Sequence, residues 1–280
     1  MKIQNFVVSY FRNKIRLLTL FSKKRAAAEA FHVFCTPYFR MVYEAREIEN
    51  AEPLSFQFEG QAAVGYRWNK GADKKLLIAH GFRSASANFK HLANALAAKG
   101  YEVIAFDAPA HGKSGGKQLT AITYKMFIEA ICRHFGDFDA SLCHSFGGLA
   151  VSMNLAEDSG TTNSKTVLIA PAANSRQLIE AFFREMRITD LMVQQYFFAK
   201  IQQLSGRDVD WFSLERCAPQ MGGQVFWVHD HDDKVTPIAD AMRVKNMELP
   251  HFHFLFTENL GHRRIYRDPN VINAVVDFLQ

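Results

Sequence analysis

A serine stands between small residues where a strand-like stretch meets a helix-like stretch. Residues 138–142 are predicted to form a short strand, residues 143–148 read CHSFGG, and a helix-like segment follows. A sharp turn from strand to helix is typical of a nucleophile elbow, which presents the serine side chain at the edge of a sheet. The positions two before and two after that serine must be small, and Gly147 meets this demand fully while Cys143 meets it in part. Ser145 is therefore a candidate nucleophile, although a serine beside glycine can also simply cap a loop.

A serine hydroxyl is a weak nucleophile at neutral pH and needs three kinds of support. A base must take its proton, a carboxylate must orient that base, and two N–H groups must stabilise the oxyanion that forms during attack. Histidine and aspartate occur together at residues 229–233 (HDHDD), and His262 follows a glycine near the C-terminus. These groups lie far from Ser145 in the sequence, so only the fold can bring them together.

The elements around these residues alternate between strand-like and helix-like patterns. The predicted strands are 54–58, 63–68, 75–79, 101–106, 140–143, 166–170, 224–229 and 251–256, and the main predicted helices are 85–98, 120–135, 148–156 and 271–279. The first two strands flank a Glu-Gly turn and form a hairpin. The alternation predicts an α/β fold with a mostly parallel central sheet and helices on both faces.

Two segments lie outside this alternation. Residues 172–221 form an insertion too long for an ordinary crossover, with two helices predicted over 174–204. Their aromatic and methionine side chains are expected on the underside of a small helical cap over the carboxyl ends of the strands, whether they bind a ligand or only pack on the sheet. We therefore divide the chain into an N-terminal helical extension (1–50), a core (51–171 and 222–280) and a cap (172–221).

The N-terminal extension is predicted to be helical over 3–21, 26–34 and 38–49. In the first helix apolar residues recur at helical spacing with basic residues between them. A basic amphipathic helix can lie on an anionic membrane surface. The more common role of such a helix is packing against the domain or a second subunit, and we favour packing over a peripheral membrane contact through residues 1–25.

Four motifs, in order along the chain, resemble those of the α/β-hydrolase superfamily from about residue 53 to the C-terminus. They are the HGF turn at 80–82, the DAPAHGKS loop at 107–114, the elbow around Ser145, and the sequence Gly261-His262 after the last strand. The serine precedes the acid and the histidine, which is the order in this superfamily. The second motif departs from the family pattern because Ala110 replaces a glycine.

The resemblance implies a role for each site residue. Ser145 would be the nucleophile, His262 the base, and Asp233, which begins a D-x-V-x-P pattern, the acid, with Asp232 as the second choice. The backbone N–H groups of Phe82 and Phe146 would form the oxyanion hole. The serine at the elbow excludes members of the superfamily that use an aspartate nucleophile, and no cofactor is implied.

Two other readings of these residues are less favoured. Cys143 could be the nucleophile, but the alternation of side chains along a strand directs it into the sheet, where a cysteine acts as core filler. The His/Asp cluster at 229–233 could bind a metal, but it would need a further ligand from elsewhere to complete a coordination shell. We assign no metal site and no chemistry to His144.

Composition limits the classes of partner. The 280 residues are 48% hydrophobic, which is enough for a large core, and no apolar stretch reaches the length of a membrane span. The net charge is +5, but residues 1–28 hold seven basic residues and no acid, so the remainder carries 26 basic and 28 acidic residues, a net charge of −2. This balance argues against a nucleic-acid-binding body. Four cysteines without regular spacing favour reduced thiols and a cytoplasmic protein.

The sequence and the resemblance together predict a serine hydrolase. Its expected substrate is a small to medium hydrophobic carboxylic ester, cleaved through an acyl-enzyme. The alternatives are a thioesterase or lysophospholipase acting on a lipid-like acyl substrate, and a non-catalytic ligand-binding member of the same fold.

Overall fold

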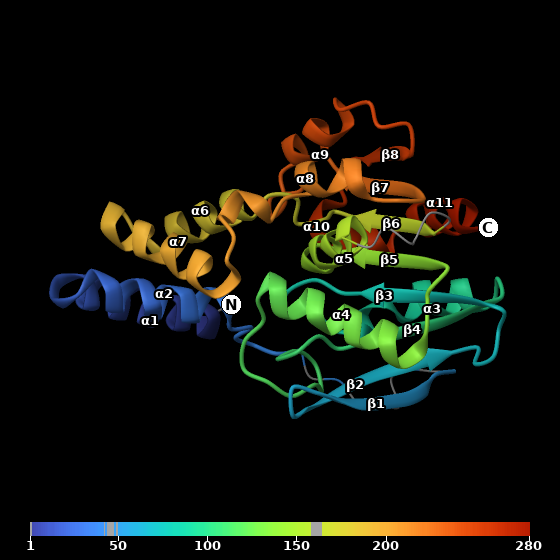
Figure 1. Ribbon diagram of the computed structural model, residues 1–280, viewed down its shortest axis with the longest axis horizontal. Helices are drawn as coiled ribbons and strands as arrows, with labels where there is room; N and C mark the ends of the chain where they lie inside the picture. The colour runs from blue at the N-terminus through green and yellow to red at the C-terminus, as the bar shows by residue number, and fades with distance from the viewer. Residues whose placement is uncertain (1, 42, 44–47, 49, 158–163) are drawn as a thin grey trace. The chain divides into compact units, whose positions relative to one another are not determined.

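The computed structural model describes residues 2–41, 43, 48, 50–157 and 164–280, with side chains described from residue 6 onward. These residues form two compact units (Figure 1). The larger unit comprises Pro37–Ala173 and Ser213–Gln280, and the smaller comprises Met1–Thr36 and Asn174–Phe212.

An eight-stranded sheet forms the centre of the larger unit. Its order is β1-β2-β4-β3-β5-β6-β7-β8, and β2 pairs antiparallel with both β1 and β4 while the remaining pairs are parallel. The strands are β1 Glu52–Phe58, β2 Gln61–Trp68, β3 Lys74–Ala79, β4 Tyr101–Phe106, β5 Ala140–His144, β6 Lys165–Ile169, β7 Gln224–Asp230 and β8 Phe252–Thr257. The predicted mostly parallel sheet with an N-terminal hairpin is confirmed.

Helices cover both faces of this sheet because the central strands are buried on both sides. Figure 1 shows α4 (Ala121–Phe135) and α5 (Phe146–Glu157) in front of the sheet, with α3 (Lys90–Ala97) and α11 (Pro269–Leu279) behind it. Side chains two apart on a strand share a face. Leu76 and Ile78 of β3 accordingly join the core formed by α3 and α11.

Several short helices of the larger unit are absent from the sequence prediction. They are α8 (Leu214–Cys217), α9 (Ile238–Lys245) and α10 (Gly261–Arg264). Of these, α9 provides the crossover between the parallel strands β7 and β8. Its first turn holds a buried acid, Asp240, which pairs with Arg243 and weakens the apolar pattern that would have marked the helix.

The smaller unit is built from two segments that are far apart in the sequence. Its helices are α1 (Lys2–Phe21), α2 (Lys23–Cys35), α6 (Ser175–Met186) and α7 (Leu191–Ser205). Their shared core combines Ile15 of α1 and small side chains of α2 with larger ones of α6, α7 and the segments that follow them: Ile15, Ala26, Ala27, Ala30, Ile179, Phe183, Met186, Ile188, Val193, Phe197 and Val209. Packing between α2 and α7 therefore joins the N-terminal segment to the insertion.

The aromatic residues of the insertion pack within this smaller unit. The ring of Phe197 lies 5.5 Å from that of Phe31 and 5.8 Å from that of Phe34, and Phe182 lies 5.2 Å from Phe34. From the sequence alone these side chains are expected beneath a cap, and nothing there connects them with the N-terminal helices. The placement of residues 172–221 as a cap stays a prediction.

The helix predicted over 38–49 falls partly outside the described residues. Those that are described, 38–41, 43 and 48, are not helical. Among the helices that the structure describes, none has a stretch both long and apolar enough to traverse a bilayer.

Ala30→Arg tests the shared core of the smaller unit. Ala30 is fully buried, so a charged side chain there would have to be desolvated or would force α2 away from α7. We expect a loss of at least about 2 kcal/mol in the free energy of unfolding, measured by urea denaturation. Ala28→Arg is the matched control, because Ala28 is exposed on the same helix. Equal losses for the two variants would contradict the shared core.

Candidate active site

Ser145 occupies the turn between β5 and α5 in a strained backbone conformation. Its φ of 53° lies in the left-handed region, which non-glycine residues seldom adopt. Backbone hydrogen bonds hold the turn: the Ser145 N–H donates to Ile169 O at 3.1 Å, and Ser145 O accepts from the N–H groups of Gly148 and Ala172. The strain is therefore maintained by the neighbouring strand β6 and by the first turn of α5.

Two glycines allow the chain to approach this turn closely. A Cβ atom at Gly147 would lie 2.4 Å from Ala79 O, and one at Gly81 would lie 2.8 Å from the Cβ atom of Ser145. Gly147 therefore fits the small-residue requirement of the elbow. Gly81 places the start of the loop after β3 directly against Ser145.

Cys143 lies inside the sheet. It is fully buried and pairs with Ala79 on β3 and Leu168 on β6. Burial raises the pKa of its thiol to about 12, so the thiolate is not populated at neutral pH. The interpretation of Cys143 as core filler agrees with this placement.

The structure brings Ser145, His262 and Asp233 into one hydrogen-bonded chain. Ser145 Oγ lies 3.0 Å from His262 Nε2, and His262 Nδ1 lies 2.7 Å from Asp233 Oδ2. These residues come from the elbow, from α10 after β8, and from the loop after β7. Ser145 is 8% exposed and the Asp233 side chain is fully buried, so the contacts lie largely out of solvent.

Backbone and side-chain donors fix the Asp233 carboxylate. Oδ1 accepts hydrogen bonds from the N–H groups of Val235 and Thr236, and Oδ2 accepts one from the Thr236 hydroxyl at 2.8 Å. Burial alone would raise the pKa of Asp233, but these bonds and the bond from His262 outweigh it and lower the pKa below its usual value. Asp233 is thus an oriented carboxylate that accepts the Nδ1–H of His262.

The other two aspartates of the cluster hold the loop that carries His262. Asp230 accepts the N–H groups of Leu260 and Gly261 and the hydroxyl of Thr257, and Asp232 Oδ2 accepts the N–H of Asn259 at 2.8 Å. Asp232, the second choice for the acid, therefore contacts the backbone before His262 rather than its ring. No sequence signal separated these roles beyond the D-x-V-x-P pattern that begins at Asp233.

His144, to which the sequence analysis assigned no chemistry, contacts the backbone of His262. Its Nε2–H donates to His262 O at 2.9 Å, and its ring centroid lies 4.7 Å from that of His262. Burial, together with the nearby His262, lowers the pKa of His144 to about 3, so the ring is neutral. The residue beside the candidate nucleophile thus tethers the candidate base.

Two backbone N–H groups flank Ser145 without an acceptor in the described part of the chain. They belong to Phe82, which follows Gly81, and to Phe146, the first residue of α5. The two phenyl rings meet edge to face at 6.0 Å and are half-buried. Donors left unpaired at a helix start beside a nucleophile are suited to bind a developing negative charge.

Other polar residues near the site form hydrogen bonds that stabilise the surrounding loops. His80 Nε2 accepts the N–H of Ala108, and Asp107 accepts four hydrogen bonds from Tyr43, Ser86 and Lys113. Ala110, which replaces the family's glycine, has a φ of 66°, a conformation that explains why glycine is usual there. This loop braces the turn after β3.

The described residues contain no group of three His, Cys, Asp or Glu side chains arranged to hold a metal ion. His229 is buried, with Trp227 Nε1 donating to its Nδ1 and its own Nε2–H donating to Thr236 O, whereas His231 is exposed. His229, Asp230 and Asp233 are therefore buried with separate hydrogen-bond partners, while His231 and Asp232 are exposed.

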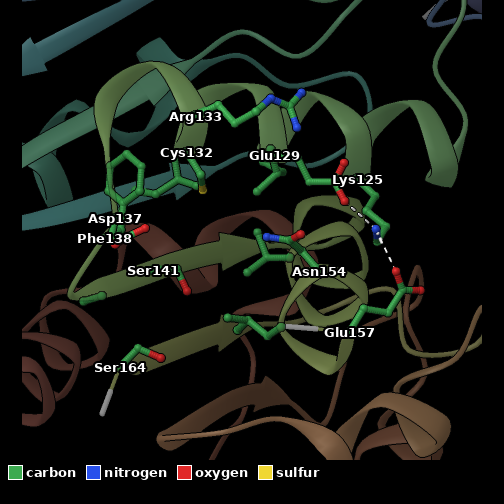
Figure 2. A pocket seen from close by; sticks show the side chains of 15 residues that line it. Lys125, Glu129, Cys132, Arg133, Asp137, Phe138, Ser141, Asn154, Glu157 and Ser164 are labelled. Atoms are coloured by element: carbon green, nitrogen blue, oxygen red, sulfur yellow. Dashed lines mark hydrogen bonds and ion pairs between the residues drawn. The ribbon is translucent and has the colours of Figure 1, made fainter. Parts of the chain in front are cut away.

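A cavity of about 440 Å³ lies at the other end of the strands from Ser145 (Figure 2). It opens between α4 and α5 near the starts of β5 and β6, and its lining includes Ser141 and Ser164. Lys125 crosses it to pair with Glu129 and Glu157 at 2.5 and 2.8 Å. None of the candidate catalytic residues lines this cavity.

Comparisons with known proteins agree with this fold. A family model described as serine aminopeptidase, S33 (Hydrolase_4), matches residues 70–216, which is more than half of the chain. A search of curated proteins finds no match. The matched region contains Phe82 and the turn at Ser145, but it ends before Asp233 and His262.

Solved structures of hydrolases are similar to the chain at low sequence identity. An esterase of Pyrococcus furiosus is 20% identical with a TM-score of 0.63, covering 86% of this chain and 96% of that one. A membrane phospholipase A, a bacterial virulence factor, is 16% identical with a TM-score of 0.64, covering 100% and 98%. A thioesterase domain from the curacin biosynthetic pathway is 14% identical with a TM-score of 0.56, covering 82% and 98%. These similarities confirm the predicted α/β-hydrolase fold.

The buried histidines of the larger unit predict a loss of stability in mild acid. Burial lowers the pKa values of His80, His111, His144 and His229 from 6.5, to about 3 for His111 and His144. As the pH falls below about 6.5, these histidines therefore bind protons in the unfolded chain before they do so in the folded one. Each histidine then lowers the free energy of unfolding by up to about 1.4 kcal/mol per pH unit. Urea denaturation at pH 7.5 and 5.0 should show this fall, and His111→Gln should make it shallower. An unfolding free energy that is constant between these pH values would contradict the burial of these rings.

Proposed function

We propose that this chain, which belongs to the serine aminopeptidase S33 family of hydrolases, is a serine hydrolase that cleaves carboxylic esters. The observation that carries the proposal is the contact of His262 with both partners. Its Nε2 lies 3.0 Å from Ser145 Oγ, and its Nδ1 lies 2.7 Å from a buried carboxylate, Asp233. This arrangement is what a hydroxyl needs to lose its proton during attack.

In the proposed reaction Ser145 Oγ attacks the carbonyl carbon of the ester while its proton passes to His262 Nε2. Asp233 holds the Nδ1–H and stabilises the imidazolium that forms. When the tetrahedral intermediate collapses, His262 returns the proton to the departing alcohol and an acyl group remains on Ser145. Water, activated by the same histidine, then hydrolyses this acyl-enzyme and restores the serine.

The oxyanion would be held by two backbone N–H groups. Phe82 follows Gly81, which approaches Ser145 closely, and Phe146 follows Ser145 directly; neither N–H has an acceptor among the described residues. Because backbone donors at fixed positions need no reorganisation as charge develops, they favour the transition state over the bound ester.

The half-buried rings of Phe82 and Phe146 support a hydrophobic substrate. They stand beside the reacting serine and would contact the acyl or alcohol part of the ester. Apolar walls with few polar groups are typical of small-molecule sites. We therefore expect small to medium hydrophobic esters to be better substrates than charged ones.

A lysophospholipase or thioesterase is the second candidate function. The similarity to a membrane phospholipase A extends over the whole chain, including the N-terminal helices, and a thioesterase domain shares the fold. Both chemistries use the same acyl-enzyme and differ only in the leaving group. The family description also makes an aminopeptidase substrate a necessary comparison.

A fluorophosphonate probe tests the proposed nucleophile. We expect one label per wild-type chain, located on Ser145 by mass spectrometry, because His262 activates that hydroxyl alone. Ser145→Ala should remain unlabelled, and Ser152→Ala, at a buried serine on α5 away from the elbow, should label like the wild type. An unlabelled wild type would refute the enzyme and favour a ligand-binding member of the fold.

A substrate panel then separates the candidates. p-Nitrophenyl esters from two to sixteen carbons, acyl-coenzyme A thioesters, a lysophosphatidylcholine and amino-acid p-nitroanilides would be compared by kcat/KM. The proposal predicts the highest values for the oxygen esters. A preference for the anilides by tenfold or more would instead support a peptidase.

His144→Ala should lower kcat by about tenfold with little change in KM. The substitution removes the hydrogen bond to His262 O, so the base loses orientation while the substrate surfaces stay in place. His144→Gln, whose amide can still donate, should restore part of the loss. Steady-state kinetics on an ester identified by the panel provide the measurement. Wild-type kcat in His144→Ala would show that the tether has no catalytic consequence.

A further inference from the structure

The helix α1 has two apolar faces, and only one of them has a partner in the smaller unit. Val8, Phe11, Ile15 and Leu18 pack in or against the core of that unit. At about 100° of rotation per residue these four side chains occupy one side of the helix. This inner face accounts for the packing role that the sequence analysis favoured.

The opposite side of α1 presents a second row of large apolar side chains. This outer face consists of Phe6, Tyr10, Leu17, Leu20 and Phe21, which are between 55% and 81% exposed. Their positions fall within an arc of about 100° around the helix axis. Single exposed apolar residues are ordinary, but five on the same side of one helix mark an interaction surface.

The charges beside the outer face that have no ionic partner among the described residues are all positive. Arg16, Lys24 and Arg25 are exposed and form no ion pair with any described residue. Arg16 is one turn from Leu20, and Lys24 and Arg25 lie in the first turn of α2, which starts at Lys23 after the N-cap Ser22. No acidic residue occurs before Glu29.

We propose that the outer face of α1 docks on an anionic lipid surface. The five apolar side chains would enter the boundary between headgroups and acyl chains, with the helix parallel to the membrane plane. The three free cations would meet phosphate groups at the level of the headgroups. This inference does not depend on the proposed hydrolysis.

Charge favours a lipid surface over a second copy of the chain. A symmetric dimer through the outer face would place the same patch of both copies in contact. Each copy would then bring Arg16, Lys24 and Arg25 to a patch that carries the same three cations, with no acid from residues 1–28 to compensate. Anionic headgroups compensate them directly.

Flotation with lipid vesicles tests the proposal on the full-length chain. Wild type should float with vesicles of phosphatidylcholine containing about 30% phosphatidylglycerol, float much less with phosphatidylcholine alone, and dissociate as NaCl is raised to 0.5 M. The triple variant Leu17→Gln, Leu20→Gln, Phe21→Gln should bind the anionic vesicles at least about tenfold more weakly.

Matched variants separate specific from general effects. Arg16→Gln, Lys24→Gln and Arg25→Gln together should weaken binding by about tenfold and reduce its dependence on salt. Replacing three exposed cations of the larger unit, Lys99→Gln, Lys117→Gln and Arg133→Gln, lowers the net charge equally and should have a much smaller effect. Thermal unfolding of each variant should match the wild type, since only exposed side chains change.

Either of two results would overturn the proposal. The first is a wild type that does not float with anionic vesicles; if that wild type also sediments as a dimer while the triple variant sediments as a monomer, the face belongs to a second copy. The second is an outer-face triple variant that floats as well as the wild type.

Discussion

The meeting of Ser145 and His262 depends on an attachment between the loops after β7 and β8. Asp230 and Asp232 accept hydrogen bonds from the backbone N–H groups of residues 259–261, and Asp233 accepts one from Nδ1–H of His262. Parallel pairing of β7 with β8 brings these loops to the same edge of the sheet. Asp230 and Asp233 each accept several donors, which orient the carboxylate and lower its pKa, so at these two residues the attachment fixes both position and charge.

Two separate features stabilise the strained turn at Ser145. Backbone bonds to β6 and α5 maintain the left-handed conformation, and glycine at 81 and 147 admits the neighbouring chain. His144, on the last position of β5, extends this rigid element to the backbone of His262. Hydrogen bonds therefore fix both members of the reacting pair: Ser145 through its backbone, and His262 through its backbone carbonyl and its ring.

The sheet and the positions of its strands could be predicted because their signals are local. Alternation of apolar strands and helices, and a serine between small residues, depend on neighbours in sequence. The grouping of Ser145, Asp233 and His262 was predicted from the resemblance. The hydrogen bond from His144 to His262 and the roles of Asp230 and Asp232 could not be predicted, because each depends on a contact between loops distant in sequence. The union of residues 1–36 with 174–212 was missed for the same reason, since the small side chains of α2 carry no sign of their partner on α7.

The central claim is that the Asp233 carboxylate makes His262 a base toward Ser145. The most direct test is the single-turnover rate of acylation by p-nitrophenyl acetate in Asp233→Asn, compared with Asp232→Asn. The account predicts a loss of about 10³- to 10⁴-fold for Asp233→Asn. Asp232→Asn should stay within a few-fold of wild type, because its side-chain oxygen can still accept the N–H of Asn259. A wild-type acylation rate in Asp233→Asn would contradict the account.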